Sequence, residues 1–315
     1  MLVSAERPVM PDIPLSTTVP REFVHRTAFA EVFLTGWNKA NEDTFTVTAQ
    51  WPRSHSFYTT EHGVYDPMLL AETVRQTFPL LNHAAYGMPF GYQLSWSYFR
   101  LTLNPQGMSV ERTPAEIELR VRCSDIRYQR GLPAAMSMHV DVLRAGTPIA
   151  VASTRFGCHT PQVYRRLRAG RGEVAEVFAS APPPPEPACC TSVGRTRSQD
   201  VVLSPTPTSG RWQLRLDTDH PVLFDHAVDH APGMLLMEAV RQAANAVDPH
   251  TRPGILTALD ITFHQYVEFS SPCWITAEAV PPISPGARSR TQVSAQQDGI
   301  PVFTASGGVA SLRNK

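Results

Sequence analysis

The chain has 315 residues, of which 28 are basic and 28 acidic, so its formal net charge is zero at pH 7. No overall electrostatic field therefore favours nucleic acid or an anionic membrane surface as a partner. Hydrophobic residues make up 42% and charged residues 18%, which is ordinary for a soluble globular protein. The length exceeds what one compact core usually needs and suits two domains of about 150 residues each.

The 29 prolines include one cluster near the N-terminus and another in the stretch APPPPEPACC at 181–190, and these clusters indicate a tail and a linker. Five cysteines, an odd number without C-x-x-C spacing, argue against a disulfide framework and a zinc site and favour a reducing compartment. The first twenty residues lack the basic and apolar regions of a signal peptide, and no 18 apolar residues run together. We therefore expect a cytoplasmic protein without a membrane anchor.

An internal repeat divides the chain into two units. DPMLLAETVRQT at 66–77 and PGMLLMEAVRQA at 232–243 align without a gap at a spacing of 166 residues. A second pair, RAGTPIAVAST at 144–154 and QDGIPVFTASG at 297–307, follows in the same order and has the alternation of a strand entered through a turn. Each unit is therefore predicted to hold one helix followed by strands.

Alternating apolar and polar residues at 115–123, 136–143 and 274–280 predict antiparallel strands. With one apolar helix per unit and no second helix to cover a sheet, the simplest packing wraps a curved sheet around that helix. This predicts an α+β fold, a double hotdog with two tandem repeats. The expected boundaries are a tail at 1–22, a first repeat at 23–165, a Pro- and Arg-rich linker at 166–200 and a second repeat at 201–315.

A polar stripe runs along the second helix, where Glu238, Arg241, Gln242 and Asn245 share one face. The other faces are apolar, so the helix should be buried and the stripe should face a cavity or a partner helix. Glu72, Arg75 and Gln76 repeat the pattern in the first helix. The alternative is an ordinary surface ion pair, but two copies in apolar surroundings favour a functional site.

Two Asp-His pairs, Asp225-His226 and Asp229-His230, stand in front of the second helix. They are either catalytic, with the carboxylate fixing the imidazole tautomer, or a network that orders the loop. Gly233 and Met234 begin the helix, whose free N–H groups are expected to hold an oxyanion. No third ligand cluster accompanies the pairs, so we expect no metal. Six further histidines are interpreted as packed or solvated: His25, His83, His139, His159, His250 and His264.

At these residues the chain resembles the A-factor biosynthesis (AfsA-like) proteins of actinomycetes. The similar segments are FVHRTAFAEVFLTGW (23–37), AQWPRSHSFY (49–58), DPMLLAETVRQ (66–76), HPVLFDHAVDHAPGMLLMEAVRQAA (220–244) and DITFHQYVEFSSPCWI (260–275). The resemblance implies a double hotdog that transfers a β-ketoacyl group from a carrier-protein or CoA thioester to the hydroxyl of dihydroxyacetone phosphate. This is the first step towards a γ-butyrolactone, butenolide or furan signal.

The resemblance also implies that Glu72, Glu238 and Arg241 are essential. The residues themselves lead us to expect no cofactor and no nucleic-acid or membrane partner, and they leave the oligomeric state open, with a homodimer as one option. We expect Glu72 or Glu238, assisted by His226, to act as a base whose pKa burial has raised. Arg241, or else Arg75, is expected to bind the phosphate. The remaining candidate substrate-binding residues are Gln76, Gln242, His230, Gly233, Met234, Asp225 and Asp229.

Two other functions remain open on the residues alone. PGMLLMEA also looks like the helix of hotdog β-hydroxyacyl dehydratases, whose catalytic histidine precedes it, but the surrounding HFPGxP pattern is absent. A hotdog thioesterase or dehydratase would not need an arginine for phosphate. A non-catalytic acyl-thioester sensor would usually bring a DNA-binding domain, and no helix-turn-helix pattern or basic arm is visible.

Overall fold

A computed structural model describes residues 17–168, 171–248, 253–280 and 290–312. The first unit is built around one long helix, α1 (Pro67–Ala84). Its strands are β1 (Leu34–Asn41), β2 (Thr44–Trp51), β3 (Gln93–Leu103), β4 (Ala115–Gln129), β5 (Leu132–Arg144) and β6 (Thr147–His159). Two short 3-10 turns precede these strands, η1 (Arg21–Val24) and η2 (Phe29–Glu31), and two more lie between elements, η3 (Glu61–Gly63) and η4 (Pro105–Met108).

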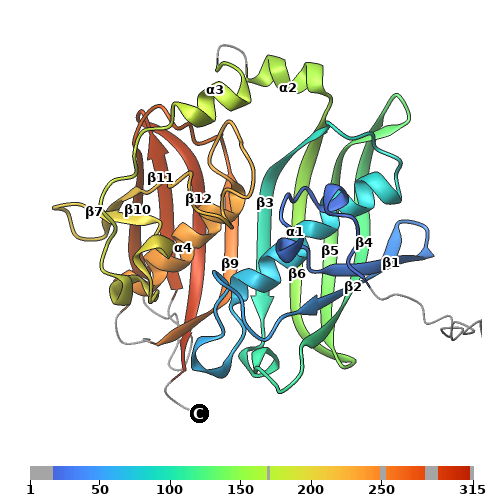
Figure 1. Cartoon of the computed structure of the whole chain (residues 1–315), viewed down its shortest axis with the longest axis horizontal. Helices are drawn as coiled ribbons and strands as arrows, with labels where there is room; N and C mark the ends of the chain where they lie inside the picture. The colour runs from blue at the N-terminus through green and yellow to red at the C-terminus, as the bar shows by residue number, and fades with distance from the viewer. Residues whose placement is uncertain (1–16, 169–170, 249–252, 281–289, 313–315) are drawn as a thin grey trace, which may run out of the picture.

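The second unit repeats this order around α4 (Gly233–Val247). Its strands are β7 (Leu203–Pro205), β8 (Arg211–Leu214), β9 (Gly254–Phe263), β10 (Cys273–Val280), β11 (Arg290–Gln297) and β12 (Ile300–Ser311). Between the units lie α2 (Pro161–Leu167), α3 (Val174–Ala179), η5 (Cys190–Val193) and η6 (Ser198–Asp200). Figure 1 shows α2 and α3 crossing from one half to the other above the sheet.

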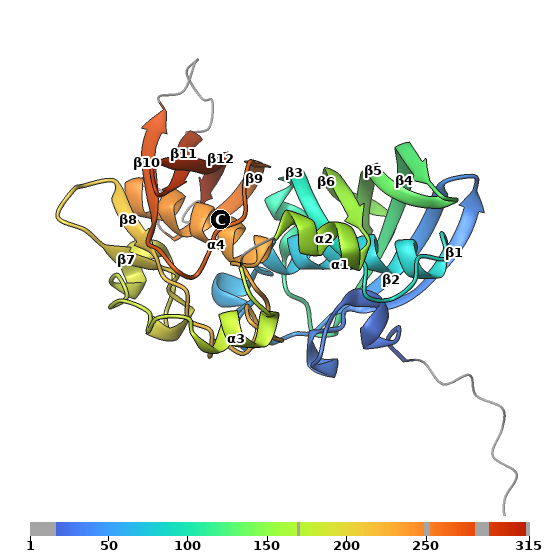
Figure 2. The ribbon, with the colours of Figure 1, turned by 90° about the horizontal axis from the view of Figure 1, so that it is seen from above.

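The described strands form one continuous antiparallel sheet in the order β1-β2-β4-β5-β6-β3-β9-β12-β11-β10-β8-β7. The order reads alike from both ends, so the units are related by a pseudo-twofold axis between β3 and β9. These two strands pair from Tyr98 with Thr262 to Thr102 with Ala258. Seen from above, each half of the sheet curves around its own helix (Figure 2). The double hotdog fold expected from the sequence is confirmed.

The two central helices lie where the repeat predicts them. α1 runs seven residues beyond the repeated segment, because Phe78, Leu80 and Leu81 continue its apolar face and are buried. Asp66 caps it, accepting a hydrogen bond from the Met68 N–H. Glu72 and Glu238 are both 0% exposed, so neither helix turns its polar stripe to solvent. Among the described helices, none is both long and apolar enough to cross a membrane.

The expected linker at 166–200 contains part of the second unit. The segment VGRTRSQDVVL at 193–203 repeats VHRTAFAEVFL at 24–34, each residue lying 169 positions later. The Ala188 N–H donates to the Leu203 carbonyl, and Arg195 reaches the carboxylate of Glu238. The second unit therefore begins before residue 190, and the boundary at 200 expected from composition cuts through it.

Candidate active site

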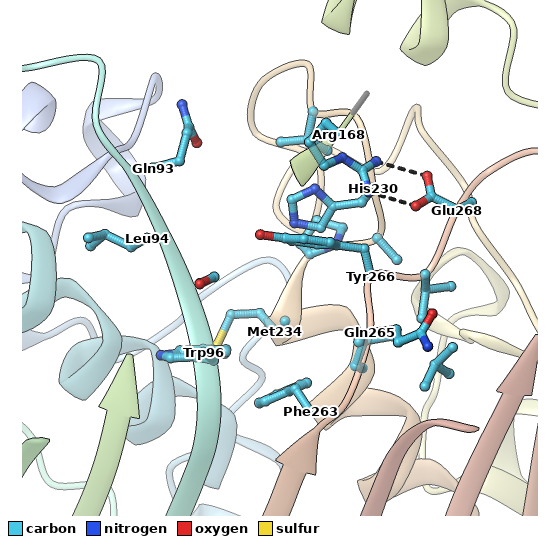
Figure 3. Close-up of a pocket in the computed structure, with 18 of the residues that line it drawn as sticks. Gln93, Leu94, Trp96, Arg168, His230, Met234, Phe263, Gln265, Tyr266 and Glu268 are labelled. Carbon is cyan, nitrogen blue, oxygen red and sulfur yellow. Dashed lines mark hydrogen bonds and ion pairs between the residues drawn. The ribbon is translucent and has the colours of Figure 1, made fainter. Parts of the chain in front are cut away.

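One cavity of about 630 Å³ lies between the units, at the N-terminal end of α4. Gln93, Leu94 and Trp96 of β3 form one wall, and the segment that follows β9 forms the other, with Met234 between them (Figure 3). Both units therefore contribute to it. The candidate site residues that line the cavity are Arg75, Asp225, His226, His230, Gly233 and Met234.

The two helix starts are not equivalent. At α1 the Asp66 carboxylate caps the helix and also lies 3.5 Å from Arg195. At α4 the corresponding residue is Pro232, which offers no side-chain cap. Gly233 and Met234, the first residues of α4, line the cavity, and no side chain caps this helix start, which is the arrangement that an oxyanion requires. Of the two pseudo-symmetric helix starts, the start of α4 is therefore the one that lies at the cavity.

Gly233 allows the two units to meet closely at this point. A Cβ atom placed on Gly233 would lie 2.2 Å from the Trp96 ring, so no larger residue fits. Trp96 in turn stacks on Phe263 with ring centroids 5.5 Å apart. The indole therefore covers the helix start and keeps one side of it apolar. Sequence reasoning found Gly233 but had no signal for its partner on β3.

His230 is held in a network of hydrogen bonds beside the helix start. Its Nδ1 lies 2.7 Å from Asp229 Oδ1, and Tyr164 donates to the same oxygen at 2.7 Å. Arg168 donates to Asp229 Oδ2 at 2.9 Å and binds Glu268 with both of its terminal nitrogens. Burial would raise the pKa of Asp229, but its bonds to His230 and Tyr164 and the Arg168 charge hold that pKa well below its usual range. The ionised carboxylate binds Nδ1 of His230 and so orients the imidazole ring. Nε2 is the second polar atom of that ring.

His226 is held more loosely. Its Nδ1 lies 3.3 Å from Asp225, and its side chain is 46% exposed, against 27% for His230. Asp225 is anchored by the backbone N–H groups of Thr27 and Ala28 in the first unit. Burial would raise the pKa of Asp225, but the His226 bond and these two N–H groups lower it to about 2. The pair therefore ties the loop before α4 to the first unit.

Glu72 is surrounded by donors. Arg26 binds it at 2.7 Å, Arg75 binds both of its oxygens at 2.8 Å, and Gln76 donates at 2.8 Å. Burial alone would raise the pKa of Glu72, but the Arg26 and Arg75 charges outweigh it and lower the pKa to about 2. Arg26 and Arg75 line the cavity, whereas Glu72 and Gln76 lie behind them. Gln76 instead bonds the backbone at Glu31 and Phe33.

Glu238 has the matching environment in the second unit. Arg195 donates to it at 2.9 Å, Arg241 at 2.6 and 2.8 Å, and Gln242 at 2.5 Å. Burial would raise the pKa of Glu238, but the Arg195 and Arg241 charges lower it to about 2. The expectation of a raised pKa for the two glutamates is therefore wrong, because each is paired with two arginines and not left alone in an apolar cavity.

The Glu238 cluster also faces away from the cavity. Gln242 bonds the backbone at Asp200 and Val202, and Arg241 lies 3.5 Å from the Gly194 carbonyl. The expectation that this stripe faces a cavity is contradicted, because the segment 193–202 covers it. Glu238, Arg241, Gln242 and Asp229 are thus absent from the cavity lining, as are Glu72 and Gln76.

Several cavity residues escaped the sequence interpretation: His25, Arg26, Trp96, His159, Arg168, His264 and Tyr266. The repeat of 24–34 at 193–203 was the available signal for Arg26 and Arg195, since it places both beside the helix glutamates. Within the part of the chain that the structure describes, no three His, Cys, Asp or Glu side chains form a metal-binding group.

Curated relatives cover nearly the whole chain. A protein of Streptomyces virginiae named 2-oxo-3-(phosphooxy)propyl 3-oxoalkanoate synthase is 47% identical over 291 residues, which is 92% of this chain and 97% of the relative. Proteins of the same name from Streptomyces coelicolor and Streptomyces griseus are each 41% identical, covering 90% of this chain and 89% and 92% of theirs.

Solved structures agree on the fold. An oleoyl thioesterase from Lactobacillus plantarum matches with a TM-score of 0.53 at 10% identity, covering 86% of this chain and 96% of that one. An acyl-ACP thioesterase from Bacteroides thetaiotaomicron matches with a TM-score of 0.50 at 10% identity, covering 85% and 98%. The family model of the A-factor biosynthesis hotdog domain matches residues 10–160 and 179–310. The chain therefore belongs to the A-factor biosynthesis hotdog domain family.

Proposed function

We propose that this protein is an acyltransferase that moves a 3-oxoacyl group from a thioester to the hydroxyl of dihydroxyacetone phosphate. The product is a 2-oxo-3-(phosphooxy)propyl 3-oxoalkanoate, the compound that the names of the relatives describe. The observation that carries the proposal at atomic level is the uncapped start of α4, which opens into the cavity beside His230.

The donor thioester enters with its carbonyl oxygen towards Gly233 and Met234. The N–H groups and the positive end of the α4 dipole stabilise the negative charge that develops on that oxygen during attack. The donor is carried by an acyl carrier protein or by CoA, which present the same phosphopantetheine arm. The acyl chain lies along the apolar wall of Trp96, Met234 and Phe263.

His230 acts as the base. Its Nε2 removes the proton from the acceptor hydroxyl while the oxygen attacks the thioester carbon. The tetrahedral intermediate collapses, the C–S bond breaks, and the imidazolium returns the proton to the departing thiolate, so the products are an ester and a free thiol. We assign this role to His230 and not to His226 because its carboxylate bond is shorter and its ring is less exposed.

The acceptor phosphate binds Arg75, with Arg26 beside it. Both guanidinium groups line the cavity, and together they carry one more positive charge than Glu72 neutralises. A charge-assisted contact to an anion is stronger than a neutral hydrogen bond. Glu72 holds the two arginines at the cavity wall, and the Glu238 cluster holds segment 193–202 against α4. Arg241, paired with Glu238 outside the cavity, is part of that scaffold.

The test is to incubate the protein with a 3-oxoacyl thioester and dihydroxyacetone phosphate and to determine the product masses. The phosphorylated ester, formed from either the carrier-protein or the CoA donor, is the expected result. Free 3-oxoacid in place of the ester would identify a thioesterase. In a parallel incubation with a 3-hydroxyacyl thioester, formation of an unsaturated thioester would identify a dehydratase. Either outcome, without ester, would overturn the proposal.

A further inference from the structure

Ser95 and His159 form a hydrogen-bonded pair on the cavity wall that the proposed reaction does not use. They lie on the neighbouring strands β3 and β6, and Ser95 Oγ is 2.6 Å from His159 Nε2. Both side chains line the cavity. Gly157 leaves room for this contact, because a Cβ atom there would lie 3.1 Å from the His159 ring and 3.3 Å from Ser95 Oγ. The pair is therefore built into the wall.

Tyr266 approaches this pair from the opposite wall. Figure 3 shows its hydroxyl pointing from the segment after β9 across the cavity towards β3. Two neighbours hold its ring: the Arg168 guanidinium carbon lies 4.6 Å from the ring centroid, and the His230 ring centroid is also 4.6 Å away. Burial raises the pKa of the Tyr266 hydroxyl, and the opposing effects of Ser95 and Arg168 are smaller, so the phenol keeps its proton. Tyr266 is thus a proton donor in a fixed position.

Both walls meet at the start of α4, where the thioester carbonyl is proposed to bind. The residue after Tyr266 accepts a hydrogen bond through its carbonyl from the Ala231 N–H at 2.9 Å, two residues before Gly233. On the other wall, Ser95 is followed by Trp96, whose indole lies against Gly233. The two hydroxyls therefore approach the helix start from opposite sides.

The three polar groups together suit a carbonyl oxygen. Burial lowers the pKa of His159, so its ring is neutral and can carry its proton on Nε2. Ser95 can then accept from His159 and donate to Tyr266, whose own proton is left for the cavity. A carbonyl oxygen only accepts, so it completes this chain. The 3-oxoacyl donor carries such an oxygen on C3, two bonds from the thioester carbon.

Other side-chain donors of the cavity suit this role less. Arg26 and Arg75 share a buried carboxylate and are assigned to the acceptor phosphate. The amides of Gln93 and Gln265 belong to exposed residues, so water satisfies them before a substrate binds. Tyr266 is half-buried, and a hydrogen bond in drier surroundings contributes more to discrimination between ligands.

We propose that Tyr266 is a specificity-determining residue whose hydroxyl donates a hydrogen bond to the C3 oxygen of the 3-oxoacyl donor, and that the Ser95–His159 pair positions that hydroxyl. This inference rests on the proposed function, because it concerns the donor at the same helix start. A saturated acyl chain has no oxygen on C3 and would leave the phenol without a partner when it binds, which lowers its relative affinity.

The experiment measures kcat/KM for ester formation with 3-oxodecanoyl-pantetheine and with decanoyl-pantetheine, which carry the arm common to both carriers. Dihydroxyacetone phosphate is the acceptor in each case. The variants are Tyr266→Phe, which keeps the ring against Arg168 and His230, and Ser95→Ala. Gln265→Ala, one residue from Tyr266, is the control, and thermal unfolding checks that all variants are folded. The intrinsic reactivities of the two thioesters cancel when each variant is compared with the parent.

We expect Tyr266→Phe to lose about three- to tenfold of the preference for the 3-oxoacyl donor, the worth of one neutral hydrogen bond. Its kcat/KM with the saturated donor should stay within about twofold of the parent, because that donor makes no contact with the phenol oxygen. Ser95→Ala should lower the preference in the same direction, and Gln265→Ala should leave it unchanged.

Three results would overturn the assignment: an unchanged preference in Tyr266→Phe, an equal fall with both donors, or a loss of preference in Gln265→Ala alone. An equal fall would show that the phenol supports the site without recognising the C3 oxygen. Failure of the parent to form ester from either donor would instead count against the proposed function.

Discussion

Asp66 and Pro232 stand at equivalent positions in front of the two central helices, and only Asp66 caps its helix. The carboxylate of Asp66 satisfies the Met68 N–H and neutralises part of the Arg195 charge, so the first helix start is closed. The prolyl residue leaves the second start open to the cavity. This one difference, between otherwise similar units, decides which of the two pseudo-equivalent ends can bind a developing oxyanion.

Pro232→Asp should close the second helix start as Asp66 closes the first. The backbone at Pro232 is already extended, so aspartate fits there, and the new cap should stabilise the fold by about 1 kcal/mol. The same carboxylate would repel the oxyanion, and acyl transfer should fall at least about a hundredfold. Pro232→Ala, which adds no cap, is the control and should stay within a few-fold. Parental rates in Pro232→Asp would show that the oxyanion binds elsewhere.

Arg75→Ala should weaken the phosphate contact. The KM for dihydroxyacetone phosphate should rise about ten- to a hundredfold, while the rate with unphosphorylated dihydroxyacetone changes little. Arg241→Ala is the matched substitution at the equivalent position of the second unit, outside the cavity. It should lower stability without changing the preference between the two acceptors. Steady-state kinetics with both acceptors decide the matter: loss of the preference in Arg241→Ala alone would move the phosphate site to the Glu238 cluster.

His230→Gln should lower kcat about 10²- to 10⁴-fold, because the amide keeps a polar side chain before α4 but cannot act as a base. His226→Gln should cost less than tenfold, since that ring is more exposed and more loosely bound to its carboxylate. Rates at saturating donor and acceptor measure both. The reverse order of the two losses would assign the base to His226.

Glu238→Gln should destabilise the protein by about 3–5 kcal/mol, because it leaves Arg195 and Arg241 buried without their counter-charge. Acyl transfer per folded molecule should nevertheless remain near the parental value. Glu72→Gln should be destabilised similarly and should also bind dihydroxyacetone phosphate less tightly, because Arg75 loses its anchor. Denaturant unfolding with activity normalised to the folded fraction separates the two effects. A specific loss of turnover in Glu238→Gln would give that carboxylate a catalytic role.

Stability should fall as the solution is acidified from about pH 4.5 to pH 2. Glu72 and Glu238 have folded-state pKa values of about 2, below the 4.5 of an unpaired glutamate. A depressed carboxylate pKa adds stability that is fully present above the unfolded value and is lost as the pH falls through the folded value. Chemical unfolding at a series of pH values measures this. A midpoint that stays constant down to pH 2 would mean that the two glutamates are not held by their arginines.

The sequence predicted the fold well because its strongest signals were local. The repeated helix and the alternating strands predict one helix and one sheet in each unit. The helices and the strands lie within a few residues of their expected positions. The polar stripe was correctly predicted to be buried. Its partners were not, because Arg195 lay in a segment whose prolines and arginines looked like a linker. A carboxylate without visible partners was therefore expected to have a raised pKa.

The cavity was harder to predict because residues from many elements form it. Trp96 on β3 meets Gly233 at the start of α4 only because β3 pairs with β9, a contact between units that no local pattern records. His25 looked ordinary, since neither its left-handed backbone nor its contact with His83 can be read from neighbouring residues. The Asp-His pairs were found because their partners are adjacent in sequence.

The continuous sheet through β3 and β9 has a consequence for stoichiometry. In two identical subunits related by a true twofold axis, any change at one helix start is made at both. Here the halves are separate stretches of one chain, so an aspartate at one start and a proline at the other can coexist. Each chain should therefore carry one working cavity. Titration with the acyl donor should saturate at one equivalent per chain. Rapid-quench kinetics should detect a burst of at most one product molecule per chain.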